Sequence, residues 1–308
     1  MSPDEIDQIR LNFNPGTLML LNIVLGLIMF GVALDLRIGD FVRVFRSPKA
    51  PVLGLLCQFL LLPALTFLLV IWIQPAPSLA LGMMLVAACP GGNISNFMTH
   101  LARGNTAVSV SMTAVSTAAA IFFTPANVAF WGSRYEPTAA ILRQVALDPL
   151  DMLFLVFVLL GVPLVLGLLI SHRFPGLADR LRRPFKFGSI AVFLLIVVLA
   201  FAGNWQNFLD YIHLVVLIVL LHNATALALG YLSSRALRLP EEDARAVAIE
   251  VGIQNSGLGL LLIFGFFQGL GGMALVAAWW GIWHIIAGLS VATFWSRRSI
   301  DLPESAGA

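Results

Sequence analysis

Glu250-Val-Gly-Ile-Gln-Asn-Ser-Gly257 is a polar, glycine-containing stretch in a chain that is otherwise strongly apolar. Two helix-breaking glycines, Gly252 and Gly257, alternate with oxygen-bearing side chains, and ten apolar or glycine residues follow directly, from Leu258 to Phe267. An acidic residue at the centre of a membrane helix costs roughly 2.5–3.5 kcal/mol, so such residues are rare and usually functional. The stretch therefore predicts a helix that opens within a bilayer and carries a functional carboxylate.

The composition of the 308 residues is that of a polytopic membrane protein. Hydrophobic residues make up 59% of the chain and charged residues 11%, whereas a soluble domain averages about 25% charged residues. We expect no cleavable signal peptide, because residues 1–16 carry Asp4, Glu5 and Asp7 where a signal would be basic.

Apolar stretches of about 18 or more residues predict membrane spans, and we expect nine of them. A short surface helix is also expected over 137–147. The predicted fold is therefore an all-α polytopic membrane protein with nine transmembrane helices. The predicted spans run approximately over 17–34, 51–73, 79–101, 106–125, 150–170, 188–202, 209–232, 246–267 and 273–295.

The Lys and Arg residues predict the orientation. Nine spans place the termini on opposite sides of the membrane. Three of the 18 Lys and Arg residues, Arg10, Arg134 and Arg143, then fall on one side, which leaves fifteen on the other. The positive-inside rule predicts an outside N-terminus and a cytoplasmic C-terminus in the cell inner (plasma) membrane. The same rule accounts for the basic loops, so we expect no nucleic-acid partner.

A second polar, broken stretch, Cys89-Pro-Gly-Gly-Asn-Ile-Ser-Asn96, lies in the third predicted span. It is the middle member of spans two to four, as the Glu250 stretch is the middle member of spans seven to nine. The two triplets enter the membrane from opposite sides. This pattern is typical of an inverted-topology repeat, in which two crossed, discontinuous helices meet near the midplane and form a substrate site.

Glu250 and Gln254 lie on one helical face at i and i+4. An opened helix frees backbone carbonyls, which need partners in a membrane, and a bound cation satisfies carbonyls and carboxylate together. Sodium is a hard ion that prefers oxygen ligands. The alternative is a structural carboxylate at the helix end, paired with Arg245.

Further candidates are polar side chains in or beside the two breaks. The hydroxyls at Ser109, Thr113, Ser116 and Thr117 follow helical spacing, although such hydroxyls are often only bonded to carbonyls of their own helix. Gln58 taken alone is typical of a satisfied buried amide. The sequence contains no zinc spacing, nucleotide loop or catalytic triad, so we expect no enzyme. Asn93, Asn255 and His284 are expected to line the crossing or its neighbourhood.

Three ordered motifs resemble the bile acid:sodium symporter family. They are Ala88-Cys-Pro-Gly-Gly-Asn-Ile-Ser-Asn-Phe-Met-Thr-His-Leu-Ala-Arg-Gly-Asn105, Ser109-Val-Ser-Met-Thr-Ala-Val-Ser-Thr117 and Ile249-Glu-Val-Gly-Ile-Gln-Asn-Ser-Gly257. Gln58 and the Trp283-His284 pair fit the family too, and the resemblance runs from about Leu21 to Trp295. It implies a core domain (48–134 and 206–308) packed against a panel domain (1–47 and 135–205).

The resemblance also implies two sodium sites behind the crossing, with Glu250 shared between them. The first would use Ser95, Asn96, Ser109, Thr113 and Glu250. The second would use Gln58, Glu250, Gln254 and the backbone oxygens of Val251 and Ile253. Asn93, Asn255 and His284 would bind the substrate.

Two departures from the family bear on the substrate. Many relatives have Thr where Asn93 stands, and several have Asn where Ile285 stands, so the substrate need not be a bile acid. The sequence thus predicts a sodium-coupled symporter that imports an organic anion, bile-acid-like or a smaller carboxylate. A proton carried by Glu250 is the alternative coupling ion. A membrane-embedded enzyme or sensor is the remote alternative.

Overall fold

The computed structural model of this chain describes residues 6–7, 15–145, 148–185, 187–188, 191 and 205–298. Within these ranges the secondary structure is helical, with no strand, and the one β-bridge joins Gly91 to Gln254. The all-α prediction is therefore confirmed for the described part of the chain. The predicted sixth span, 188–202, lies almost entirely outside the described residues.

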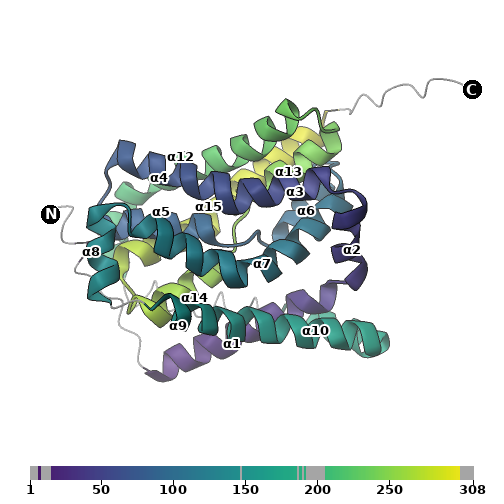
Figure 1. The fold of residues 1–308 in the computed structure, drawn as a ribbon, viewed down its shortest axis with the longest axis horizontal. Helices are drawn as coiled ribbons and strands as arrows, with labels where there is room; N and C mark the ends of the chain where they lie inside the picture. Colours follow the sequence, from purple (N-terminus) through teal and green to yellow (C-terminus); the bar gives the residue numbers. More distant parts are fainter. Residues whose placement is uncertain are drawn as a thin grey trace, which may run out of the picture.

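The other eight predicted spans coincide with single helices or with two or three consecutive helical segments (Figure 1). The expected surface helix is α8. The elements are α1 (Pro15–Asp35), α2 (Ile38–Arg46), α3 (Lys49–Leu56), η2 (Cys57–Leu61), α4 (Leu62–Ile73), α5 (Pro77–Ala88), α6 (Ile94–Leu101), α7 (Thr106–Gly132), α8 (Glu136–Gln144), α9 (Pro149–Val156), η3 (Phe157–Gly161), α10 (Val162–Arg173), α12 (Trp205–Ala236), α13 (Glu241–Gly252), α14 (Ser256–Phe266) and α15 (Gly271–Ser296).

Five helices of the described chain are long and apolar enough to cross a membrane, and three shorter ones are also apolar. The protein is therefore a multi-pass membrane protein. The long ones cover Lys49–Ile73, Thr106–Gly132, Leu150–Arg173, Ile212–Ala236 and Gly271–Ser296, and the shorter ones cover Gly26–Asp35, Pro77–Ala88 and Ser256–Phe266.

One predicted boundary was wrong. The fourth span was expected to end at Pro125, but α7 continues through this proline to Gly132. Membrane helices tolerate an interior proline because neighbouring groups satisfy the backbone that it frees. The breaker signal that ends a helix in water therefore does not end this one.

The two predicted breaks are present and they cross. The chain leaves the helical conformation between α5 and α6, and again between α13 and α14. The Gly92 amide donates to the Ile253 carbonyl at 2.7 Å, and the Asn255 amide donates to the Pro90 carbonyl at 2.8 Å. In Figure 1, α6 and α13 lie together at one end of the molecule, while α5 and α14 extend toward the other.

Helix α5 lies at the centre of the molecule. Every residue from Ser78 to Ala88 is buried, as expected for a helix that is apolar all round. The largest apolar cluster joins it to α14 and α15, through side chains such as Leu85, Leu262 and Trp280. Helices α1, α9 and α10 form a layer along one side of the other helices (Figure 1). The first break thus follows directly from a fully buried helix.

Candidate functional site

Glu250 lies in the last turn of α13, and its side chain is 1% exposed. Three hydroxyl groups from α6 and α7 donate hydrogen bonds to its carboxylate: Ser95 at 2.5 Å, Thr113 at 2.7 Å and Ser109 at 3.0 Å. These side chains come from positions up to 155 residues away in the chain. The fold therefore surrounds a buried carboxylate with hydroxyl oxygens.

Asn96 completes this cluster. Its Oδ1 lies 2.8 Å from the Ser109 hydroxyl oxygen and 3.3 Å from that of Thr113, so it is an alternative acceptor for the one hydrogen of each group. A hydroxyl that donates its one hydrogen still has lone pairs to offer to a cation. The structure thus joins all five residues predicted for the first sodium site into one group of hydrogen-bonded oxygens. Their role as sodium ligands stays a prediction.

Glu250 has no basic partner among the described residues. Arg245 does not pair with it, because its guanidinium binds Glu241 at 2.9 Å and the carbonyls of Ala102 and Trp295 at 2.9 and 3.1 Å. The structural alternative, a Glu250–Arg245 ion pair, is therefore wrong. A buried carboxylate without a counter-charge is costly. The cluster around Glu250 accordingly suits a cation.

The residues predicted for the second sodium site form an adjoining group. Gln58 Nε2 donates to Gln254 Oε1 and to the Cys89 carbonyl, both at 2.7 Å. Gln254 Nε2 donates to the Val251 carbonyl, also at 2.7 Å. The Oε1 atom of Gln58 is buried, and no described residue donates to it. This oxygen is available to a hard cation.

A local irregularity positions Gln58. The residue lies in η2, a π-helical turn that ends two residues before Pro63. Proline cannot bond the carbonyl four residues earlier, which belongs to Phe59, and Asn127 Nδ2 donates to that carbonyl at 3.1 Å. Single π-helical turns are frequent at functional sites. Here the turn lies beside both breaks.

The hydroxyls of α7 divide into two kinds. Ser109 and Thr113 reach Glu250, whereas Ser116 donates to the Thr113 carbonyl of its own helix at 3.2 Å. Thr117 lines a cavity beside the crossing. Helical spacing alone did not show whether these hydroxyls bond to their own helix or to the site. Ser116 bonds to its own helix.

The three residues predicted to bind substrate all line that cavity, whose volume is about 580 Å³. Its polar wall comes from the two breaks and includes Asn93 and Asn255, while Met29 of α1 contributes to an apolar wall. His284 also lines it, with an Nδ1 atom that has no partner among the described residues. Asn255 in addition caps α14, since its Oδ1 accepts the Leu258 amide at 3.0 Å.

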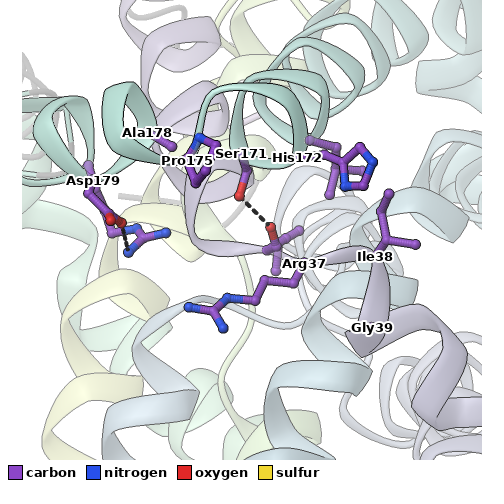
Figure 2. Close-up of a pocket in the computed structure, with 11 residues that line it drawn as sticks. Arg37, Ile38, Gly39, Ser171, His172, Pro175, Ala178 and Asp179 are labelled. Atoms are coloured by element: carbon purple, nitrogen blue, oxygen red, sulfur yellow. Dashed lines mark hydrogen bonds and ion pairs between the residues drawn. The ribbon is translucent and has the colours of Figure 1, made fainter.

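A separate cavity of about 520 Å³ lies where α1 and α2 approach the end of α10 (Figure 2). Arg37, His172 and Arg182 line it, and none of the predicted site residues does. Arg182 is already paired, with Asp35 at 2.8 Å and with Asp179 at 3.0 Å. This cavity is therefore distinct from the crossing.

Two residues beside the crossing were not predicted to belong to the site. Thr124 Oγ1 donates to the Ala88 carbonyl and Asn223 Nδ2 donates to the Gly252 carbonyl, both at 2.7 Å. Both side chains are buried. The sequence marks Thr124 and Asn223 as polar residues within predicted spans. It does not show which neighbour each side chain reaches, because that depends on how the helices pack.

Comparison with known proteins identifies the family. The model of the Sodium Bile acid symporter family matches residues 22–211. The chain belongs to the Sodium Bile acid symporter family. The predicted resemblance is thereby confirmed.

Relatives of the chain come from bacteria, plants and animals. The uncharacterized sodium-dependent transporter YocS of Bacillus subtilis is 32% identical over 90% of this chain and 83% of its own length. The probable sodium/metabolite cotransporter BASS1, chloroplastic, of Oryza sativa subsp. japonica is 32% identical over 87% of this chain, which spans only 63% of that relative. The ileal sodium/bile acid cotransporter of Homo sapiens is 30% identical over 77% of this chain and 67% of its own length.

Proposed function

We propose that this protein is a sodium-coupled symporter that imports an organic anion. The observation that carries the proposal is the buried Glu250 carboxylate, which lies at the crossing of two broken helices among hydroxyl and amide oxygens. Oxygen-only clusters suit hard cations such as sodium. Membership of a sodium symporter family supports transport, and we propose no enzymatic activity for this protein.

Two sodium ions would bind, one on each side of Glu250. The first would be held by Ser95, Asn96, Ser109, Thr113 and Glu250. The second would be held by Gln58, Gln254, Glu250 and the carbonyls of Val251 and Ile253. The hydrogen bonds within each group support this division, as does the Gln58 Oε1 atom, which has no donor among the described residues.

The substrate would bind in the cavity beside the crossing. Asn93, Asn255 and His284 would contact its polar group, and apolar side chains of α1 would contact its apolar part. These α1 side chains are Ile28, Met29 and Val32. Asp35 of α1 also lines the cavity, and its carboxylate is paired with Arg182 at 2.8 Å. One carboxylate beside two sodium ions leaves positive charge, which an anionic substrate offsets. This balance gives sodium and substrate a physical reason to favour each other's binding.

Transport would follow from motion between two domains. We propose nine spans, with an inverted repeat formed by spans two to four and seven to nine. The repeat would form the core domain, 48–134 and 206–308, and residues 1–47 and 135–205 would form the panel domain. The cavity has walls from both domains, which suits alternating access. The protein would lie in the inner (plasma) membrane with its C-terminus in the cytoplasm.

The test is thermal stability of the detergent-purified protein in sodium against potassium at equal ionic strength. A ligand that binds the folded state raises its stability, so we expect a higher melting temperature in sodium and no difference between the salts in Glu250→Ala. The exposed carboxylate variant Glu136→Ala is the control and should keep the sodium effect. Equal melting temperatures of the wild type in both salts would contradict sodium coupling. Uptake that follows pH instead would favour the proton alternative.

A further inference from the structure

Three successive carbonyl groups at the end of α13 each accept a hydrogen bond from a different source. The donors are the Gln254 side chain for Val251, the Asn223 side chain for Gly252 and the Gly92 backbone for Ile253, all at 2.7 Å. A carbonyl released from a helix inside a membrane needs such a partner. Two of the donors belong to the crossing itself, and only Asn223 comes from another helix, α12.

Gln58 occupies the corresponding place at the first break. Its Nε2 donates to the Cys89 carbonyl at 2.7 Å, just after the end of α5. Each of the two amides lies on the helical segment that precedes its broken helix: Gln58 in η2 and Asn223 in α12. The two residues are therefore counterparts in the proposed repeat, although the sequence around them is unrelated.

The oxygen atoms of the two amides share a second property. Oε1 of Gln58 and Oδ1 of Asn223 are both buried, and neither has a hydrogen-bond donor in the described part of the chain. A buried acceptor without a partner costs free energy. Each amide therefore combines a donor that is used at a break with an oxygen that no described group uses.

The packing of α12 directs Asn223 toward α13. The neighbouring residue, His222, is hydrogen-bonded to Thr66 of α4 at 2.7 Å, and its ring lies 4.7 Å from the ring of Trp280 of α15. These contacts fix the rotation of α12 about its axis. Asn223 is therefore held against the break by the surrounding core.

We propose that Asn223 is a positioning residue of the second sodium site and the counterpart of Gln58. Its amide fixes the peptide between Gly252 and Ile253. The carbonyls on either side, those of Val251 and Ile253, are thereby held available to the ion. The Oδ1 atom of Asn223 is buried with no donor among the described residues, as is Oε1 of Gln58, so it would be available to a cation bound beside it. The inference rests on the proposed sodium coupling.

The experiment measures the sodium concentration that gives half of the maximal thermal stabilisation of the purified full-length protein, at constant ionic strength. Asn223→Ala should raise this midpoint about tenfold, the effect of losing one hydrogen bond to a buried group. It should also make the sodium dependence less steep, as should Gln254→Ala. Thr138→Ala is the matched control, because Thr138 also donates to a helix-end carbonyl, that of Gly132, at the α7–α8 corner. It should lower the melting temperature without moving the midpoint.

The outcomes separate this inference from the proposed function. A wild-type midpoint in Asn223→Ala would overturn the role of Asn223, even if the melting temperature fell, while sodium coupling would stand. If the wild type itself gains no stability from sodium, both proposals fail. Asn223→Ser, which keeps a short donor, is the second variant in case Asn223→Ala does not fold. We expect an intermediate midpoint for it, and an unchanged one would again overturn the proposal.

Discussion

Both breaks interrupt a helix inside the protein, but they differ in the side chains that they contribute. The first covers five residues, from Cys89 to Asn93, and has no charged side chain. The second covers three residues, from Ile253 to Asn255, and directly follows the turn that carries Glu250. The glycines of the first break leave space for a neighbouring side chain. The turn before the second break supplies the charged side chain of Glu250. The cation site that we propose requires both breaks, because its ligands come from the two segments where they meet.

Gly91 shows how closely the breaks depend on each other. A Cβ atom at this position would collide with the Glu250 carboxylate. The absence of a side chain in the first break is thus what admits the charged side chain of the second. Each prediction below alters one side of this relationship.

The largest effect is expected from Gly91→Ala. The added methyl group displaces the Glu250 carboxylate, and the upper end of overpacking costs, roughly 3 kcal/mol, corresponds to about a hundredfold loss of sodium affinity. Sodium titrations of thermal stability would measure it. Gly259→Ala on α14 is the control, because a Cβ there would make only ordinary contacts of 3.7 and 3.8 Å. Equal sodium affinities of the two variants would show that the breaks do not constrain each other.

A smaller effect is expected from Gln58→Ala, which removes the side chain that joins the two breaks. The Cys89 carbonyl and Gln254 Oε1 both lose their donor, and a buried group left unpaired costs about 1–3 kcal/mol. We expect sodium affinity to fall about tenfold and the sodium dependence of uptake to become less steep. The exposed amide variant Gln144→Ala should match the wild type. An unchanged steepness in Gln58→Ala would place this residue outside the ion sites.

The smallest effects compare two hydroxyls on α7. Thr113→Val removes one of three hydroxyl donors to Glu250. Because Ser95 and Ser109 remain, we expect the loss of one ordinary hydrogen bond, about 1 kcal/mol, which weakens sodium binding about fivefold. Ser116→Ala removes only a bond within the helix and should leave the sodium affinity unchanged. Sodium-dependent uptake in proteoliposomes would test both. The reverse ranking would mean that the ion lies farther along α7 than we propose.

Much of the site was predictable because membrane sequences mark polar groups clearly. Glu250, Gln254, Ser95 and Asn96 stand out in spans where a polar side chain is expensive, and the glycines beside them predicted the breaks. The structure brings each of them to the crossing. The end of α7 was not predictable, because the effect of Pro125 depends on the groups that surround it.

The sequence by itself determined the class of protein, the places where two helices open and the family. Each of these follows from local composition or from the order of residues in a motif. Only the tertiary structure decided which polar groups meet. Ser116 faces its own helix while Thr113 reaches Glu250, Arg245 binds Glu241 instead of Glu250, and Asn223 reaches Gly252. The reason is physical: hydrogen-bond partners depend on the rotation and register of packed helices, and helical periodicity alone does not set either one.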